Sequence, residues 1–133
     1  MIDSPWKGEK PHDVGMAPSM NDLTMTALED ALRGLATRQR VIADNIANVQ
    51  TPGFLARRVD FESSLRSAID SGMASPATVD ISQSTAPTRL DGNNVNLDDE
   101  TVDLMQTGLR YQTMLEGMNA KFRLLGTAIR GEA

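Results

Sequence analysis

The sequence of 133 residues contains no cysteine and few aromatic residues, and both shortages restrict what the protein can be. Without cysteine there is no disulfide framework, no thiolate nucleophile and no zinc-finger spacing. Aromatic residues make up 4% of the chain, so little bulk is available to fill a wide globular core. Leu, Ile, Val, Ala and eight Met supply the apolar side chains instead, which suits thin contacts between helices. We therefore expect one domain at most.

A basic surface and long apolar runs are also missing. The net charge of −5 argues against a general nucleic-acid-binding protein, whose affinity would require a basic surface. No run of about 18 apolar residues occurs, so we expect no transmembrane helix. The N-terminus lacks the apolar core of a secretory signal peptide, so we expect any export from the cytoplasm to follow another route.

The first part of the chain predicts a tail followed by a long helix. Residues 1–20 contain Pro and Gly without periodicity and predict a disordered or extended tail, in which the only histidine, His12, is given no role. Residues 21–50 predict an N-terminal helix, with Ser19 or Thr26 as competing starts. Its apolar residues follow spacings of three and four, which is typical of a seam, the line along which one helix packs on another. The predicted seam consists of Met25, Leu28, Leu32, Leu35, Gln39, Ile42, Ile46 and Val49.

A sharp turn ends this helix. Pro52 has no N–H with which to continue a helical ladder, and it disfavours the α region for Thr51. Pro52 and Gly53 fit the two central positions of a type II turn, because glycine takes φ > 0 there without penalty. We therefore expect the chain to reverse direction at this point.

Residues 51–96 predict an irregular middle segment. Residues 55–60 have the composition of a short extended segment. The residues after it predict a helix of two to three turns, from the spacing of Phe61, Leu65, Ala68 and Ile69. Residues 71–96 are rich in Ser, Thr, Pro, Gly, Asp and Asn, and only Val79 and Ile81 alternate as in a strand. This part predicts either a mobile loop or a marginal hairpin.

Residues 97–133 predict a C-terminal helix. Acidic residues in its first turn oppose the helix dipole, Asn96 or Asp98 is placed to cap it, and Gly131 is placed to end it. The predicted seam consists of Leu104, Gly108, Tyr111, Leu115, Met118, Phe122, Leu125 and Ile129. Apolar residues beyond the seam are typical of a partner site, and they are Val102, Met105, Leu109, Met114 and Leu124.

No catalytic, cofactor or metal site is predicted. The stretch from Asp91 to Val102 fails as a calcium loop, because Asn96 stands where glycine is needed and Val102 where a bidentate glutamate belongs. With one histidine in a tail and carboxylates explained by a helix end, the sequence offers no constellation for an enzyme. The predicted fold class is mainly α, with two long heptad-patterned terminal helices packed as an antiparallel pair. An irregular middle segment with a short helix and a loop or small hairpin joins them.

The end of the first helix resembles a known family. The stretch Asn45-Ile46-Ala47-Asn48-Val49-Gln50-Thr51-Pro52-Gly53-Phe54 resembles the N-terminal signature of the flagellar rod and hook family, the axial proteins of the bacterial flagellum. The following Ala56-Arg57-Arg58-Val59-Asp60-Phe61-Glu62 looks like the continuation in proximal-rod members. The C-terminal half, with Gly92-Asn93-Asn94-Val95-Asn96-Leu97-Asp98-Asp99-Glu100, is also similar to a proximal-rod member. The resemblance covers residues 25–131.

The resemblance implies a structural subunit of the proximal rod that links the membrane ring to the rest of the rod. It implies as partners other copies of the chain, other rod subunits, the membrane-ring protein, the ring-rod adaptor and the flagellar type III export apparatus. It implies a periplasmic location in the basal body, reached from the cytoplasm without a cleavable signal peptide. The two seams would then also serve as an assembly interface. The alternative is a soluble helical-hairpin adaptor or regulatory interaction protein, which would use the same seams without needing the Asn-x-x-Thr-Pro-Gly-Phe wording.

Overall fold

The computed structural model describes residues 20–72 and 76–131. Three helices and two strands follow one another as α1 (Met20–Ala47), β1 (Arg57–Asp60), α2 (Glu62–Asp70), β2 (Asp80–Gln83) and α3 (Leu97–Arg130). The predicted mainly helical fold class is confirmed. The predicted tail lies outside the described residues, except for Met20.

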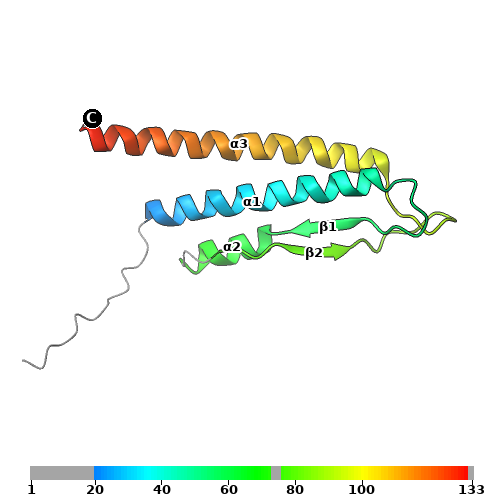
Figure 1. The fold of residues 1–133 in the computed structure, drawn as a ribbon. Helices are drawn as coiled ribbons and strands as arrows, with labels where there is room; N and C mark the ends of the chain where they lie inside the picture. Colours follow the sequence, from blue (N-terminus) through cyan, green and yellow to red (C-terminus); the bar gives the residue numbers. More distant parts are fainter. Residues whose placement is uncertain (1–19, 73–75, 132–133) are drawn as a thin grey trace, which may run out of the picture.

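The two long helices lie side by side (Figure 1). α1 lies between α3 on one side and the layer of β1, α2 and β2 on the other, and α1 and α3 run in opposite directions in this view. The Asn45 amide contacts Glu100 near one end of the pair. Towards the other end, a Cβ atom on Gly117 would lie 3.7 Å from Leu28 Cδ2. α3 extends beyond the first described residues of α1 (Figure 1).

The ends of the helices agree with several local signals in the sequence. α1 begins at Met20, next to Ser19, the earlier of the two predicted starts, which lies outside the described residues. It ends at Ala47 and not at residue 50, because residues 48–53 already form turns. Asn96 caps α3, its side-chain oxygen accepting from the backbone N–H groups of residues 98 and 99. Gly131 ends α3 with a φ of 70°, as predicted.

In the middle segment, β1 and β2 form a small sheet, and α2 lies between them in the sequence. The predicted extended segment and short helix are confirmed as β1 and α2. β2 pairs with β1 in antiparallel register, with Arg57 opposite Gln83 and Asp60 opposite Asp80. β2 therefore pairs with the earlier strand β1 and not with a second strand within residues 71–96, as the marginal hairpin would require. α2 connects the two strands, so the connection is much longer than a tight hairpin turn.

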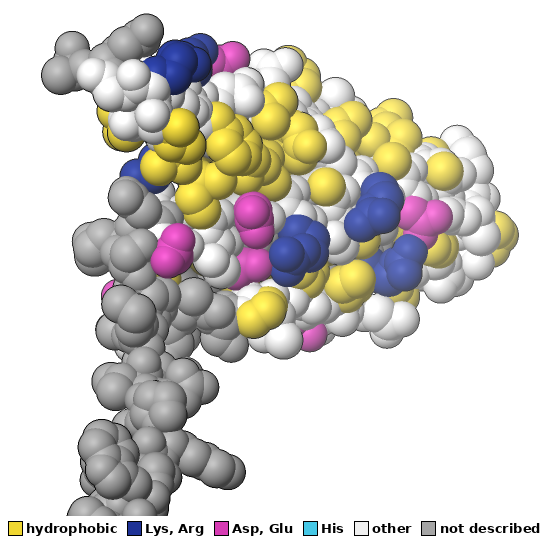
Figure 2. Space-filling view, turned by 60° about the vertical axis from the view of Figure 1, so that its left-hand side comes forward, with side chains coloured by type: hydrophobic (Ala, Val, Ile, Leu, Met, Phe, Trp, Pro, Cys, Tyr) yellow, Lys and Arg dark blue, Asp and Glu magenta, His cyan; other side chains and the backbone are white. Residues whose placement is uncertain are grey.

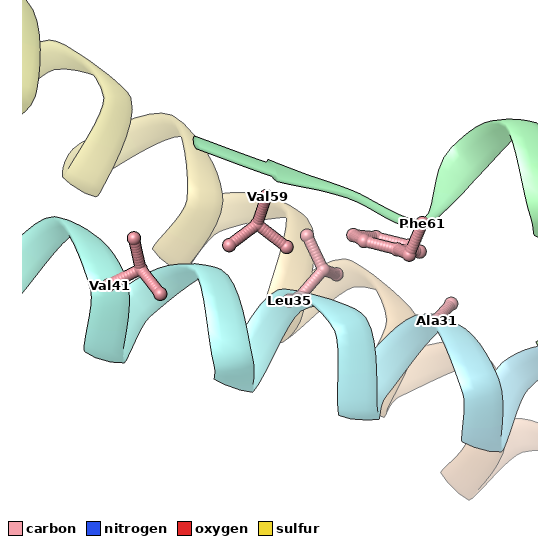
Figure 3. Close-up of a cluster of buried hydrophobic side chains, with 5 residues drawn as sticks. All are labelled: Ala31, Leu35, Val41, Val59 and Phe61. Atoms are coloured by element: carbon pink, nitrogen blue, oxygen red, sulfur yellow. The ribbon is translucent and has the colours of Figure 1, made fainter. Parts of the chain in front are cut away.

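A hydrophobic core fills the space between α1 and β1 (Figure 3). Val59 and Phe61 point from β1 and its end toward α1, whereas Asp60 between them is exposed, as the alternation of side chains along a strand requires. Buried Asp30 adds a polar tie, because its Oδ2 accepts from the Ala77 N–H at 3.0 Å. The core cluster consists of Ala31, Leu35, Val41, Val59 and Phe61.

α3 turns a different face toward the rest of the fold than the predicted one. Glu100 and Thr107 are buried, and Met114 packs against the core cluster. The assignment of Met114 to the apolar surplus is therefore wrong, because its side chain belongs to the inner face. Three residues of the predicted seam are instead increasingly exposed, namely Leu115 at 40%, Phe122 at 54% and Ile129 at 86%. The other predicted residues of this seam are half-buried, and they are Leu104, Gly108, Tyr111, Met118 and Leu125.

Gly34 allows Phe61 to pack against α1. Gly34 is buried, and a Cβ atom there would lie 2.3 to 2.5 Å from three atoms of the Phe61 ring. We expect Gly34→Ala to lower the free energy of unfolding by about 1–3 kcal/mol, because the buried ring would have to move. Gly117→Ala is the matched control, since its Cβ meets only ordinary contact distances and the change raises helix propensity. Urea unfolding followed by circular dichroism compares the two, and equal or greater stability of Gly34→Ala would contradict this account.

Candidate functional site

A buried polar junction lies where the end of α1 meets the start of α3. We define this junction by the side chains of Asn45, Asn93, Asn94 and Glu100, all of which are buried. They come from α1, from the loop before α3 and from the first turn of α3. The two stretches that carry the family resemblance, one around residue 50 and one around residue 95, are therefore joined in space.

Asn45 bridges three elements with one side chain. Its Oδ1 accepts from the Arg57 N–H at 2.9 Å, and its Nδ2 donates to the Arg57 carbonyl at 2.9 Å. The same Nδ2 donates to Glu100 Oε2 at 3.1 Å. This pair of bonds to one residue imitates a strand partner, so α1 ends beside the first residue of β1 and in contact with α3.

Glu100 is a fully buried carboxylate with a charged partner. Arg58 Nη1 donates to Glu100 Oε1 at 2.6 Å, while Asn45 holds the other oxygen. The sequence predicts Glu100 to be part of an acidic first turn. In the structure, buried Glu100 has a different role from its exposed neighbours Asp98 and Asp99. Glu100 lies seven residues before Thr107 and shares its helix face, but only the structure shows that this face is buried.

Asn93 and Asn94 fasten the loop before α3 to the turn after α1. Asn93 Nδ2 donates to the Asn48 and Thr51 carbonyls at 2.8 and 2.9 Å. Asn94 Oδ1 accepts from the Ala56 N–H at 2.7 Å, and its Nδ2 donates to carbonyls of the segment after β2. Both side chains thus form hydrogen bonds with backbone groups, as other backbone groups do in regular secondary structure. These contacts could not be predicted from the sequence, since asparagine is common in turns for local reasons.

The predicted turn forms at Pro52-Gly53. Gly53 has a φ of 74°, as a type II turn requires, and the Phe54 N–H donates to the Thr51 carbonyl at 3.2 Å to close the turn. The Gly53 N–H donates to the Asp91 carbonyl at 2.8 Å. Gly92 approaches so closely that a Cβ atom on it would lie 3.3 Å from Gly53 Cα. Two glycines with positive φ thus let the two loops meet at the junction.

The remaining motif residues surround the junction without entering it. Ile46, Asn48 and Phe54 are half-buried, whereas Ala47, Thr51 and Pro52 are exposed. Asn48 Nδ2 donates to the carbonyl of Asp44 at 2.8 Å. In the α1 seam, Leu35 and Ile42 are buried, and the half-buried members are Met25, Leu28, Leu32, Gln39, Ile46 and Val49. Val49 lies beyond the end of the helix. The role of the two seams in an assembly interface stays a prediction.

Arg38 provides a second polar tie in the middle of α1. Its guanidinium lies 4.9 Å from the centroid of the Phe61 ring, donates to the Val59 carbonyl at 2.9 Å and pairs with Glu62 at 2.6 Å. Partial burial disfavours the charged form of Glu62. The hydrogen bond and charge of Arg38 outweigh burial and hold the pKa of Glu62 below its ordinary value. α1 is therefore tied to both β1 and α2.

The polar groups of the junction serve to hold the surrounding elements together. Within residues 20–72 and 76–131, no enclosed side-chain nitrogen or oxygen lacks a hydrogen-bond partner. The same ranges contain no group of three or more His, Asp or Glu placed to hold a metal ion. A saturated network has no group left over to bind a substrate, so the junction acts by holding helices and loops in one arrangement.

The first site prediction concerns Asn45. Asn45→Ala removes bonds to both polar groups of Arg57 and one bond to Glu100, so we expect the free energy of unfolding to fall by about 1–3 kcal/mol. Asn119→Ala is the matched control, because Asn119 is exposed on α3. Urea unfolding measures both variants. Equal stability of the two would mean that water replaces the amide without loss.

The second site prediction concerns Gly53. A β-branched residue at positive φ is strained by about 1–2 kcal/mol, and at Gly53 that strain would also separate the two loops of the junction. Gly72 has a φ of 66° and equally open surroundings, but it only ends α2. We therefore expect Gly53→Val to lower the thermal midpoint more than Gly72→Val. If calorimetry gives the same midpoint for both variants, the contact between the two loops contributes nothing.

Comparison with known proteins agrees with the resemblance that the sequence suggested. A family model described as "Flagella basal body rod protein" matches residues 25–54. The flagellar basal body rod protein FlgB of Bacillus subtilis is 33% identical over 121 residues, which cover 81% of this chain and 94% of that protein. FlgB of Escherichia coli K12 is 30% identical over 123 residues, covering 77% of this chain and 89% of that protein. On these grounds the chain belongs to the family of the flagellar basal body rod protein FlgB.

Proposed function

We infer that this chain is a structural subunit of the proximal rod of the bacterial flagellar basal body, where it links the membrane ring to the rest of the rod. The relatives described above are flagellar basal body rod proteins, which supports a structural role in the flagellar rod. The finer position within the rod is our proposal. A saturated polar junction in place of a reactive cleft agrees with a subunit that holds its neighbours in place and catalyses nothing.

The observation that carries this proposal is the apolar surface that α3 leaves exposed. Hydrophobic side chains gather in the upper part of the molecule in Figure 2, the level at which α3 lies in Figure 1. Large exposed apolar surfaces mark interaction sites. The exposed apolar residues of α3 include Val102, Met105, Leu109, Leu115, Phe122, Leu124 and Ile129. We propose that adjoining subunits cover them, in contacts that repeat without closing and so build a rod.

We further propose that α1 and α3 act as a heptad-patterned antiparallel pair in the assembled rod. The partners would be other copies of the chain, other rod subunits, the membrane-ring protein and the ring-rod adaptor. The chain would reach the periplasm through the flagellar type III export apparatus without cleavage of a signal peptide. None of the described helices is long and apolar enough to cross a membrane.

Deletion and complementation test the proposal. In the flagellated bacterium that encodes this chain, deletion should leave membrane rings without rods, and the chain supplied from a plasmid should restore both rods and swimming. Electron microscopy of isolated basal bodies and swimming in soft agar are the measurements. Complete rods in the deletion strain would contradict a role in the rod and favour the soluble adaptor.

Leu124→Asp tests the apolar surface of α3. Leu124 is exposed on the helix. The matched control is Leu90, which is fully exposed in the loop before α3. We expect Leu124→Asp to keep its helical content by circular dichroism and to be missing from basal bodies, because a charge would be buried against a neighbour. Leu90→Asp should assemble normally. Incorporation of both variants would place the contacts elsewhere.

A further inference from the structure

A cleft rich in arginine lies between α1, β1 and α3, beside the polar junction. It encloses about 210 Å³, and four arginines line it, namely Arg38, Arg57, Arg58 and Arg110. Asp103 is the carboxylate among the lining residues. Arginine therefore dominates the lining of the cleft, although the whole chain is acidic.

Arg110 differs from the other arginines of the cleft. Arg38 pairs with Glu62, Arg57 with Asp44 and Arg58 with Glu100. Asp103 lies 3.9 Å from Arg58. Arg110 is exposed and forms no ion pair or side-chain hydrogen bond with any residue in the described ranges. It therefore presents an uncompensated positive charge to the cleft.

Thr107 adds an unused hydroxyl to the same cleft. The other threonines of α3, at positions 101, 113 and 127, each donate to the carbonyl four residues earlier. Thr107 is only 3% exposed, yet its hydroxyl makes no such bond and finds no other partner among the described residues. Because no enclosed polar atom in these residues is unsatisfied, this hydroxyl is open to the cleft. Gln106, one residue earlier, also lines the cleft and makes no side-chain hydrogen bond in the described residues.

These groups match a carboxylate. A guanidinium, a hydroxyl and an amide all donate hydrogen bonds to carboxylate oxygens, and the planar guanidinium does so with two parallel bonds. Gln106, Thr107 and Arg110 stand at relative positions i, i+1 and i+4 on one helix, so Arg110 lies one turn from the other two. Together they form a site that can accept an anion.

We propose that this cleft receives the carboxylate of Asp99, at the start of α3, from a second copy of the chain, with Asp98 beside it at the rim. This proposal rests on the rod function proposed above. Asp98 and Asp99 are exposed and form no ion pair in the described residues. They are followed by exposed Val102, and Arg110 is preceded by exposed Leu109, so apolar and charged groups match on both sides of the contact.

In a rod, contacts between copies must repeat, so we assign this contact as heterologous. Asp99 and Arg110 are separated by eleven residues of one helix, or about 16 Å at 1.5 Å per residue. One copy's Asp99 on the next copy's Arg110 leaves a free Arg110 on the first copy and a free Asp99 on the second. Such a contact extends in one direction until another kind of subunit ends the series.

The absence of cysteine from the sequence makes a disulfide test specific. We would introduce Asp98→Cys and Leu109→Cys together, which leaves Asp99, Thr107 and Arg110 in place. Within one chain these two positions are about 16 Å apart along α3, beyond the reach of a disulfide. Oxidised basal bodies should therefore give a ladder of dimers, trimers and larger species on a non-reducing gel. Dimers alone would mean a closed, two-fold contact and would overturn the proposal.

Charge reversal tests which groups hold the contact. In the cysteine background, Arg110→Glu should lower the cross-linked fraction of incorporated chains roughly tenfold or more, because two carboxylates would face each other. Adding Asp99→Arg should restore the ladder. The matched control is Arg123→Glu, an exposed arginine of α3 outside the cleft, which should leave the ladder intact. An equal loss with Arg123→Glu, or no rescue by Asp99→Arg, would overturn the pairing.

The same preparation separates the two proposals. If the chain without substitutions is missing from basal bodies, the rod function fails. If the double-cysteine chain is present in basal bodies but forms no disulfide, the rod function survives and the docking of Asp99 at Arg110 is wrong.

Discussion

The fold depends on the buried carboxylate of Glu100. A charge removed from water is costly unless it is paired and fully hydrogen-bonded. Glu100 meets this condition only where Arg58 from β1 and Asn45 from α1 converge on it. Because the three residues belong to three different elements, satisfying one side chain fixes α1, β1 and α3 at a single point. Asn93 and Asn94, in the loop before α3, then hold the turn after α1 beside this point.

This arrangement also fixes how α3 is placed along α1. A slip of one helical turn would move Glu100 by about 5.4 Å and leave a buried charge without its partners, at a cost of about 3–5 kcal/mol. At the other end of the described pair, α3 extends beyond the first described residues of α1, and apolar residues of α3 become exposed. The uncovered apolar surface suits a subunit that completes its packing on neighbours.

Features that depend on local backbone chemistry could be predicted from the sequence. Pro52-Gly53 requires a turn, Asn96 caps a helix and Gly131 ends one, whatever the rest of the chain does. Features that depend on distant partners could not. Nothing local shows that Gly34 makes room for the Phe61 ring or that β2 pairs with β1 across α2. Asparagine and glutamate have ordinary surface roles in turns and first helical turns, so the burial of the junction residues was also hidden.

The predicted seam of α3 consists of two rows of residues. One row faces inward throughout, and the other is half-buried at Gly108 and increasingly exposed at Leu115, Phe122 and Ile129. Leu104, Tyr111, Met118 and Leu125 are all half-buried, but the second inner position is filled by Glu100, Thr107, Met114 and Lys121. Three of these four residues are polar or charged, so a search for apolar spacing selects the neighbouring positions, which include Leu115, Phe122 and Ile129. Those residues form an apolar row beside the true contact with α1. The two adjacent rows therefore leave α3 able to pack on α1 through the inner row and, as we propose, on another subunit through the row of Leu115, Phe122 and Ile129.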